Sequence, residues 1–183
     1  MTTLRVDTAK HLLDAVPYTA SPNHDARPPG AEIDLIVIHG ISLPPGQFGG
    51  RDIDRLFTNR LPCDARPEYQ ALAGLRVSAH LLIRRGGALT QFVPFDKRAW
   101  HAGESCYKGR RRCNDFSIGV ELEGADAQRY TPEQYRALAA AVRALLAAYP
   151  ALSERRITTH ADIAPGHKTD PGPFFERDFL ARY

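Results

Sequence analysis

The segment from His160 to Pro173 gathers histidine, lysine and aspartate side chains, which can bind a metal ion or stabilise charge on a substrate. Its prolines and glycines predict a rigid, irregular loop rather than a helix. Such a loop is a poor core element, but it can hold polar side chains in place. A chemical role therefore requires partners for this loop from elsewhere in the chain.

Three potential metal ligands, His39, His160 and Asp170, lie at expected strand ends or within this loop. Catalytic zinc typically takes three nitrogen or oxygen ligands and leaves a position for water. Pro171 favours an extended Asp170, and an extended segment would place the Lys168 side chain on the same side as the aspartate. From the residues alone, a metal site and a hydrogen-bonded polar loop are equally good interpretations.

Two other histidines compete with these ligands. His80 lies on the less apolar face of an expected strand, and His101 follows Trp100 in a short turn. Both positions are more typical of a hydrogen-bonding or substrate-contacting residue than of a ligand. In an extended segment His167 would point away from Lys168, so we expect it to be solvated.

Two carboxylates share one face of an expected strand over residues 117–123. Gly119, Glu121 and Glu123 alternate on this face, opposite an apolar one. Carboxylates beside a glycine predict a face that meets a ligand. Glu121 is the preferred candidate, because Gly119 and the strand interior place it deeper, and Glu123 is its rival.

The elements that must position these residues predict an α+β fold. An apolar strand ending at His39 is expected to be central and covered on both faces, with its site at the carboxyl end. Thr131 and Gln134 form a capping box that begins a helix ending at Pro150. The result is a mixed or mostly antiparallel sheet flanked by helices, with strands over 32–39, 77–83, 89–93, 117–123 and 156–159 and a last helix near 174–180.

Two segments have no clear place in this sheet. Residues 1–31 are expected to be irregular, with residues 1–21 as an extension of a single domain that spans 1–183. Residues 42–75 form a long connection with short helices near 52–57 and 67–73. A connection of this length often forms a lid or a binding loop.

Composition narrows the function classes. The chain has 183 residues and a formal net charge of +3, with no apolar run of the roughly 20 residues that span a bilayer. No export signal is recognised in the sequence, so we expect a cytoplasmic protein. Nothing in the sequence requires an oligomer, so we expect a monomer. Three dispersed cysteines predict free thiols. The basic cluster at residues 108–112 is too short and too poor in aromatics to favour nucleic acid.

Several motifs together resemble the zinc-dependent N-acetylmuramoyl-L-alanine amidase family, which includes the peptidoglycan-recognition proteins. The resemblance is strongest to its cytoplasmic branch, which acts on 1,6-anhydro-muropeptides, and it runs from about Pro22 to about Phe179. The motifs are Val37-Ile38-His39, residues 41–50, residues 78–83, residues 94–98, Ala99-Trp100-His101-Ala102-Gly103, residues 112–119 and residues 160–173.

The resemblance implies a role for each matching residue. It implies that His39, His160 and Asp170 bind Zn²⁺, that Glu121 is the catalytic carboxylate and that Lys168 is the cation beside the metal. Arg76, Trp100, His101, Arg112 and Ala164 are expected to contact an anhydro-muropeptide substrate. Related enzymes often carry asparagine where this chain has Gly40, so an amide that could bind substrate is missing.

The resemblance also supplies rival functions. Because some members bind muropeptides without cleaving them, a non-catalytic binding module is the main alternative. The presence of Asp170, Glu121 and Lys168 favours an enzyme. An exported amidase acting on the intact wall is a weaker alternative, and neither nucleic acid nor membrane is an expected partner.

Overall fold

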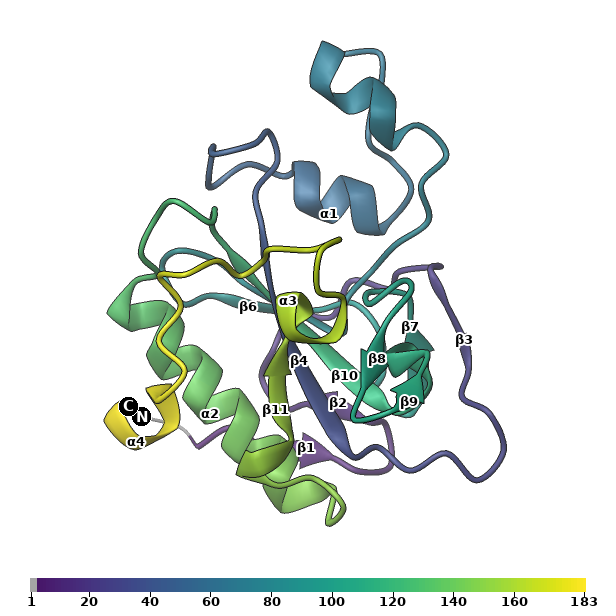
Figure 1. Ribbon diagram of the computed structural model, residues 1–183, viewed down its shortest axis with the longest axis vertical. Coiled ribbons are helices and arrows are strands. Elements are labelled where there is room, and N and C mark those ends of the chain that lie inside the picture. Colours follow the sequence, from purple (N-terminus) through teal and green to yellow (C-terminus); the bar gives the residue numbers. More distant parts are fainter. Residues whose placement is uncertain (1–2) are drawn as a thin grey trace.

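The centre of the molecule is a five-stranded sheet in the order β11-β4-β10-β5-β6 (Figure 1). A computed structural model describes residues 3–183. The sheet strands are β4 (Leu35–Ile41), β5 (Leu81–Ile83), β6 (Leu89–Gln91), β10 (Ser117–Glu123) and β11 (Ile157–Thr159). Neighbours are parallel except β5 and β6, which form an antiparallel hairpin. The expected α+β fold with a central mixed sheet is confirmed, although parallel pairing predominates.

Strand β4 is buried on both faces, as its apolar sequence predicts. Ile36 and Ile38 belong to the main core beneath helix α2 (Pro132–Ala148), while Leu35 and Val37 pack into a smaller core on the opposite face. A strand covered on both sides reads as a continuous apolar run. Helix α2 accordingly covers one face of the sheet (Figure 1).

Helix α2 begins as the sequence predicts. The Thr131 hydroxyl accepts a hydrogen bond from the Gln134 backbone N–H, and the Gln134 side chain accepts one from the Thr131 N–H. These bonds satisfy two N–H groups that a helix start would otherwise leave free. The Gln134 amide also donates to the Glu123 carbonyl, so the start of the helix is fixed to the end of β10.

The remaining elements are short and lie around the sheet. Three two-stranded ribbons pair β1 (Val6–Asp7) with β2 (Leu12–Leu13), β3 (His24–Ala26) with β7 (Lys97–Ala99), and β8 (Cys106–Tyr107) with β9 (Arg110–Arg111). The short helices are α1 (Asp52–Phe57), α3 (His160–Ile163), α4 (Phe179–Arg182) and the 3₁₀ turns η1 (Pro67–Leu72), η2 (Cys113–Asp115) and η3 (Glu154–Arg156). Helices α1 and η1 form an arm above the sheet (Figure 1).

Some sequence-based boundaries were wrong. Residues 3–31 contain short strands, because the buried Gln91 side chain accepts a hydrogen bond from the Leu13 N–H and donates one to the His11 carbonyl. The second strand begins only at Leu81, and the last helix begins at Phe179 rather than near Phe174. In each case the boundary depends on a partner that is distant in the sequence.

Within residues 3–183, none of the helices is both long and apolar enough to cross a membrane.

Candidate metal and catalytic centre

Three parallel strands bring the candidate residues to one edge of the sheet. Glu121 of β10 lies directly opposite His39 of β4, and Thr159 of β11 lies opposite Ile38. His160 follows Thr159 and therefore emerges beside His39. Because parallel strands end at the same edge, residues about 80 and 120 positions along the chain from His39 meet there.

His39, His160 and Asp170 form a compact set of potential metal ligands. One ligand atom from each lies within 4.8 Å of the others. The Nδ1 atom of His39 is 3.3 Å from an Asp170 carboxylate oxygen, and the Nδ1 atom of His160 is 3.1 Å from one. Both histidines are buried, and the aspartate is partly buried. The structure thus assembles the three ligands that the sequence indicated.

The protonation preferences of this set suit a divalent cation. Burial lowers the pKa of His39 to about 4, although its hydrogen bond to Asp170 opposes the shift. Burial alone would raise the pKa of Asp170, but hydrogen bonds to His160 and His39 outweigh it and hold that pKa below its usual value. A neutral imidazole and an ionised carboxylate are the forms that bind metal. Two imidazoles and one carboxylate also match the ligand set of catalytic zinc sites.

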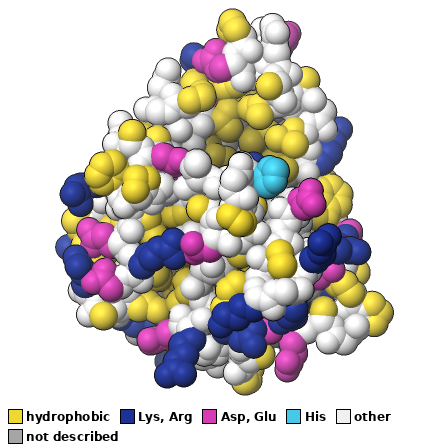
Figure 2. All heavy atoms as spheres, viewed as in Figure 1, with side chains coloured by type: hydrophobic (Ala, Val, Ile, Leu, Met, Phe, Trp, Pro, Cys, Tyr) yellow, Lys and Arg dark blue, Asp and Glu magenta, His cyan; other side chains and the backbone are white. Residues whose placement is uncertain are grey.

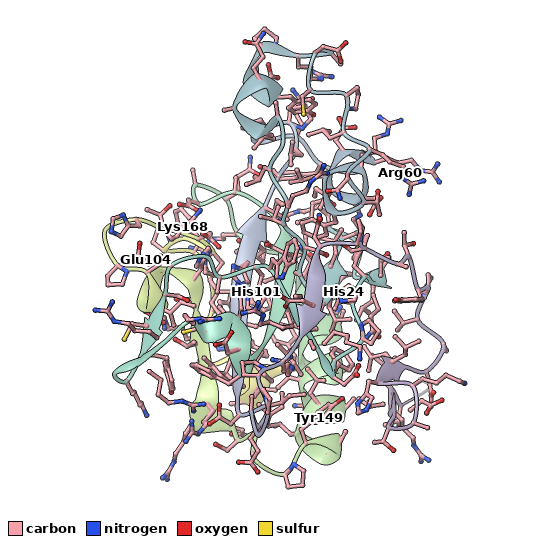
Figure 3. All side chains as sticks on the ribbon, turned by 90° about the vertical axis from the view of Figure 1, so that its right-hand side faces the viewer. His24, Arg60, His101, Glu104, Tyr149 and Lys168 are labelled. Atoms are coloured by element: carbon pink, nitrogen blue, oxygen red, sulfur yellow. The ribbon has the colours of Figure 1, made fainter. Side chains whose placement is uncertain are left out.

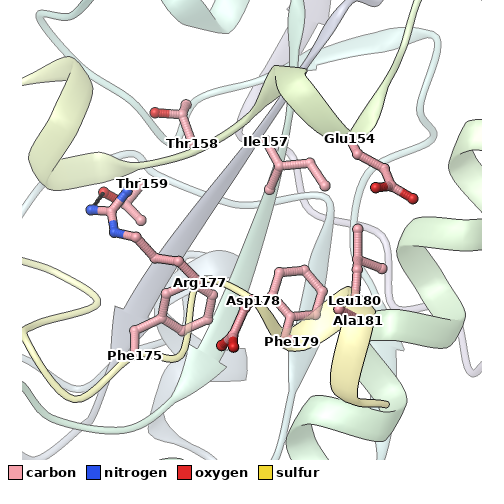
Figure 4. A pocket seen from close by; sticks show the side chains of 10 residues that line it. All are labelled: Glu154, Ile157, Thr158, Thr159, Phe175, Arg177, Asp178, Phe179, Leu180 and Ala181. Carbon is pink, nitrogen blue, oxygen red and sulfur yellow. Dashed lines mark hydrogen bonds between the residues drawn. The ribbon is translucent and has the colours of Figure 1, made fainter.

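His160 is placed by a helical turn that the sequence analysis did not predict. The first residues of the 160–173 segment form α3, because Thr159 and Asp162 cap the turn through reciprocal hydrogen bonds. Arg177 binds both Asp162 oxygens, at 2.7 and 3.0 Å. Its guanidinium also donates to the Thr159 hydroxyl at 3.3 Å, and Figure 4 shows these two side chains next to each other. The prediction of a wholly irregular loop was therefore wrong at its start.

Asp170 is held by its neighbours in the loop. Its carbonyl accepts a hydrogen bond from the Ala161 N–H at 3.0 Å. The buried Tyr130 hydroxyl donates to the Pro171 carbonyl at 2.9 Å. A Cβ atom at Gly40 would lie less than 2.5 Å from that hydroxyl, and one at Gly124 equally close to the tyrosine ring. The two glycines therefore provide the slot in which Tyr130 lies.

Gly40 has a different consequence from the one that the sequence suggested. The Tyr130 hydroxyl occupies the space where a side chain at position 40 would begin, so this space is not open to a substrate. The sequence analysis did not identify Tyr130, since a tyrosine just before a helix cap carries no signal of a distant contact. The two glycines at neighbouring strand ends were the only hint.

Glu121 is a buried carboxylate in an unusual state. Only 8% of its surface is exposed, and its Oε2 atom has no hydrogen-bond partner among the described residues. Burial, with the nearby charge of Asp170, raises its pKa well above the usual value, while Lys168 opposes the shift. A buried carboxylate without a protein partner beside a potential metal site is a good candidate to hold and release a proton.

Glu123 has different surroundings, although it lies on the same strand face. Its carboxylate binds Arg84 at 3.0 Å and accepts hydrogen bonds from the backbone N–H groups of Gly49 and Arg85. Arg84 in turn binds Asp54 of α1 at 2.7 Å. Glu123 therefore links the sheet to the 42–75 connection and has no free oxygen for chemistry.

A pocket of about 330 Å³ opens over the centre, and His39, Glu121, His160, Lys168 and Asp170 all line it. Its far wall comes from the 42–75 connection and is mostly apolar, and hydrophobic side chains gather in this hollow beneath the arm (Figure 2). The wall includes the polar Ser42 and Glu68 together with Leu43, Pro45, Leu56, Phe57, Tyr69, Leu72 and Leu75. The long connection thus forms a wall of the pocket.

The five residues expected to contact substrate divide into three groups. Trp100 and His101 line the pocket. Arg76 and Arg112 are exposed; Arg76 lies between the pocket-lining Leu75 and Val77, and Arg112 pairs with Asp115 at 3.2 Å. Ala164 is buried, and its carbonyl accepts the Lys168 N–H at 3.0 Å, so it positions the loop. Their contact with substrate stays a prediction.

His80 and His101, the two histidines that competed as ligands, are close to other polar atoms of the protein. His80 is fully buried; its Nδ1 accepts the Gly119 N–H at 3.0 Å, and its Nε2 is 3.0 Å from the Lys97 carbonyl. His101 has both ring nitrogens near protein atoms, one of them 2.9 Å from His39 Nε2. Figure 3 shows His101 within the body of the molecule and Lys168 on the C-terminal loop.

Comparison with known proteins gives the same family along most of the chain. The model of the N-acetylmuramoyl-L-alanine amidase family matches residues 29–173. The chain is 58% identical over 156 residues to the 1,6-anhydro-N-acetylmuramyl-L-alanine amidase AmpD of Escherichia coli (strain K12), which covers 85% of each protein. It is 45% identical over 170 residues to AmpD of Haemophilus influenzae, covering 93% of this chain and 92% of the relative.

Solved structures agree with this result. A crystal structure of a selenomethionine derivative of AmpD superimposes with a TM-score of 0.92, at 51% identity and 97% coverage of both chains. A complex of the E. coli amidase AmiD with anhydro-N-acetylmuramic acid-L-Ala-D-γ-Glu-L-Lys gives a TM-score of 0.61 at 30% identity, covering 85% of this chain and 60% of that one. The chain belongs to the N-acetylmuramoyl-L-alanine amidase family and is an amidase.

Proposed function

We propose that the protein is a zinc-dependent amidase that hydrolyses the bond between (1,6-anhydro-)N-acetylmuramic acid and L-alanine in muropeptides, as part of cytoplasmic peptidoglycan recycling. The observation that carries the proposal is Glu121, which is buried, lies in register with His39, lines the pocket and has no hydrogen-bond partner for its Oε2 atom among residues 3–183. The high identity to AmpD proteins supports the substrate class.

His39, His160 and Asp170 would hold the zinc ion. When bound, zinc supplies a Lewis acid that polarises a carbonyl and makes water more acidic. The protein's task is to fix the three ligands and to leave the side toward the pocket open. The burial of both histidines and the ionised state of Asp170 support this assignment.

Glu121 would manage the proton. In hydrolysis the water oxygen bonds to the lactyl carbonyl carbon, and the carbon–nitrogen bond to L-alanine breaks. Glu121 takes one proton from the attacking water and returns it to the leaving nitrogen, so that an amine rather than an amide anion departs. Burial raises the pKa of Glu121, which supports a carboxylate that holds a proton more readily than an exposed one and can pass it on.

Lys168 would stabilise the negative charge on the carbonyl oxygen in the tetrahedral state. Its side chain lines the pocket beside Asp170, and it lies close enough to Glu121 to affect the pKa of that residue. A fixed ammonium group near a developing oxyanion lowers the barrier. The substrate carries peptide carboxylates, so the exposed Arg76 and Arg112 have an electrostatic reason to attract it.

A non-catalytic muropeptide-binding module is the alternative, and the site counts against it. A binding module does not need an ionisable group buried without a partner, which costs stability. Lys168 and Glu121 both line the pocket beside the candidate ligands, which supports a hydrolytic role. The cytoplasmic location and the monomeric state stay predictions.

The test is cleavage of a purified anhydro-muropeptide by the zinc-loaded protein, with free peptide detected by mass spectrometry. We expect cleavage at the lactyl–alanine bond, loss of cleavage with a chelator and recovery with zinc. Binding without cleavage would support the binding module instead. Cleavage that resists the chelator would contradict the zinc mechanism.

A further inference from the structure

A set of buried hydrogen bonds lies behind the metal candidates, on the side away from their shared ligand atoms. His39 Nε2 is 2.9 Å from His101 Nδ1, and His101 Nε2 is 3.2 Å from the Ser117 hydroxyl oxygen. The Ser117 hydroxyl is in turn 2.6 Å from the Cys113 carbonyl oxygen. The chain of contacts therefore runs from a candidate ligand to a backbone carbonyl.

The carbonyl at the end sets the direction of every bond in this chain. A carbonyl oxygen can only accept, so the single hydroxyl proton of Ser117 points to Cys113. Ser117 can then only accept from His101, which places the His101 proton on Nε2. His101 Nδ1 is left as an acceptor, so His39 must donate from Nε2 and keeps a free lone pair on Nδ1.

The second histidine is oriented in the same way. His160 Nε2 is 3.3 Å from the Ala102 carbonyl, which again can only accept. With a metal ion bound, the Nδ1 atoms of His39 and His160, which contact Asp170 in the metal-free protein, would both present a lone pair to the ion in place of a proton. Adjacent residues, His101 and Ala102, thus support both ligand histidines from behind.

The segment that carries these supports is itself fixed. The Asn114 side-chain oxygen accepts hydrogen bonds from the backbone N–H groups of His101 and Ala102, at 3.1 and 2.8 Å. The ring of His101 occupies the space above Gly119, where a Cβ atom would lie less than 3.0 Å from its atoms. Gly119 is therefore a slot for His101 rather than a surface that meets a ligand.

We infer that His101 and Ser117 are positioning residues that fix the proton of His39 on Nε2 and so present Nδ1 to the metal. The inference rests on the proposed zinc function and goes beyond it, because it gives His101 a role through His39 instead of contact with substrate. Partners of this kind commonly change metal affinity by about 10- to 100-fold.

The test is a competition titration of zinc against a chromophoric chelator, with three variants. His101→Leu removes the acceptor, and we expect zinc affinity to fall by about 10- to 100-fold. His101→Asn places a side-chain oxygen where Nδ1 was, so its affinity should lie closer to the wild type than to His101→Leu. Ser117→Ala removes the acceptor of the His101 proton. It should lower the zinc affinity although no candidate ligand is changed.

A second readout excludes a general structural effect. Cobalt(II) replaces zinc in such sites and has a visible spectrum that reports on its ligands. This spectrum should change in His101→Leu and Ser117→Ala. It should not change in the control His11→Leu, because the His11 side chain contacts Tyr149 away from the candidate ligands. Thermal melts of the metal-free proteins identify a variant that does not fold. If a His101 variant does not fold, the zinc affinity and cobalt spectrum of Ser117→Ala decide the test.

Two outcomes would overturn the inference. One is wild-type zinc affinity and an unchanged cobalt spectrum in Ser117→Ala; the other is equal loss of affinity in His101→Asn and His101→Leu. Failure of the wild-type protein to bind zinc would overturn the proposed function and this inference together. The wild-type titration therefore separates the two failures.

Discussion

The two glutamates on β10 show how neighbouring residues of one type can have different roles. Glu123 is held by Arg84 and two backbone N–H groups, whereas the Oε2 atom of Glu121 has no hydrogen-bond partner in the part of the chain that the structure describes. Sequence alternation alone placed both on one face, and only the structure shows which carboxylate is neutralised by a salt bridge.

We expect Glu121→Ala to lose most turnover while keeping its zinc, because the residue handles a proton and is not a ligand. A loss of general acid–base catalysis costs about 10²- to 10⁴-fold in rate. The matched variant Glu123→Gln should keep turnover but lower the free energy of unfolding. Peptide release and bound zinc are measured on the same samples; an inactive Glu123→Gln with an active Glu121→Ala would reverse the assignment.

Glu121 also predicts a pH dependence of stability. Because burial raises its pKa, the folded protein holds this proton more tightly than the unfolded chain. The protonated Glu121 therefore contributes its full stabilisation at pH values below the pKa of an exposed glutamate, about 4.3. This stabilisation is lost as the pH rises through the pKa of Glu121 in the folded protein.

The metal-free Glu121→Gln protein should thus be more stable than the wild type at pH 8, by about 1–3 kcal/mol, the cost of a buried unsatisfied polar group. The difference should shrink toward pH 4. Urea titrations of metal-free wild type and variant across this range measure it. A difference that stays constant with pH would show that ionisation of Glu121 is not its cause.

At the level of elements, the sequence predicts what local chemistry determines. The bounds of α1 and β10 match the expected ranges, and the Thr131 capping box begins α2 as predicted. The expected strand at Val77 failed because its first residues bond to loops: the Ser78 N–H donates to the Trp100 carbonyl. Such bonds depend on tertiary contacts that a local pattern does not contain.

The candidate site likewise contains residues that the sequence points to and residues that it does not. Its candidate ligands could be named from the sequence, because the residues alone left a metal site and a polar loop equally open and the family resemblance favoured the metal site. The residues that hold them could not, since Tyr130 and Ser117 are ordinary residue types whose roles depend on the Pro171 and Cys113 carbonyls. The turn at α3 was also missed, although Thr159 and Asp162 have the three-residue spacing of a cap.

Tyr130→Phe tests how the Asp170 loop is held. Losing the hydrogen bond to the Pro171 carbonyl should cost about 1 kcal/mol and weaken zinc binding by up to about tenfold, because Asp170 becomes less fixed. Tyr135→Phe is the matched control, since its hydroxyl accepts the Glu176 N–H away from the metal ligands. Isothermal titration with zinc should show a lower affinity in Tyr130→Phe than in Tyr135→Phe. Equal zinc affinity in the two variants would show that Tyr130 does not help to hold Asp170.

At the scale of the whole molecule, zinc would join distant parts of the chain. His39 lies on the central strand, while His160 and Asp170 belong to the C-terminal segment that Arg177 and Tyr130 brace. A ligand that binds only the folded state stabilises it in proportion to its concentration.

Zinc at about 1,000 times its dissociation constant should raise the free energy of unfolding by about 4 kcal/mol. For a chain of this size that corresponds to a rise in Tm of about 10 °C. Calorimetry over a series of free zinc concentrations measures it, with Asp170→Asn as the control that should show little rise. A Tm independent of zinc in the wild type would contradict the assigned ligand set.

The strand order of the sheet also governs when the site can exist. β4 is the first long strand to be synthesised, yet both of its partners, β10 and β11, belong to the second half of the chain. While the ribosome is still adding residues, the apolar β4 has no neighbour in the sheet and is a natural target for chaperones. His39 gains its candidate partners late, because His160 and Asp170 are translated about 120 and 130 residues after it, so a zinc ion would bind only after these residues have been added.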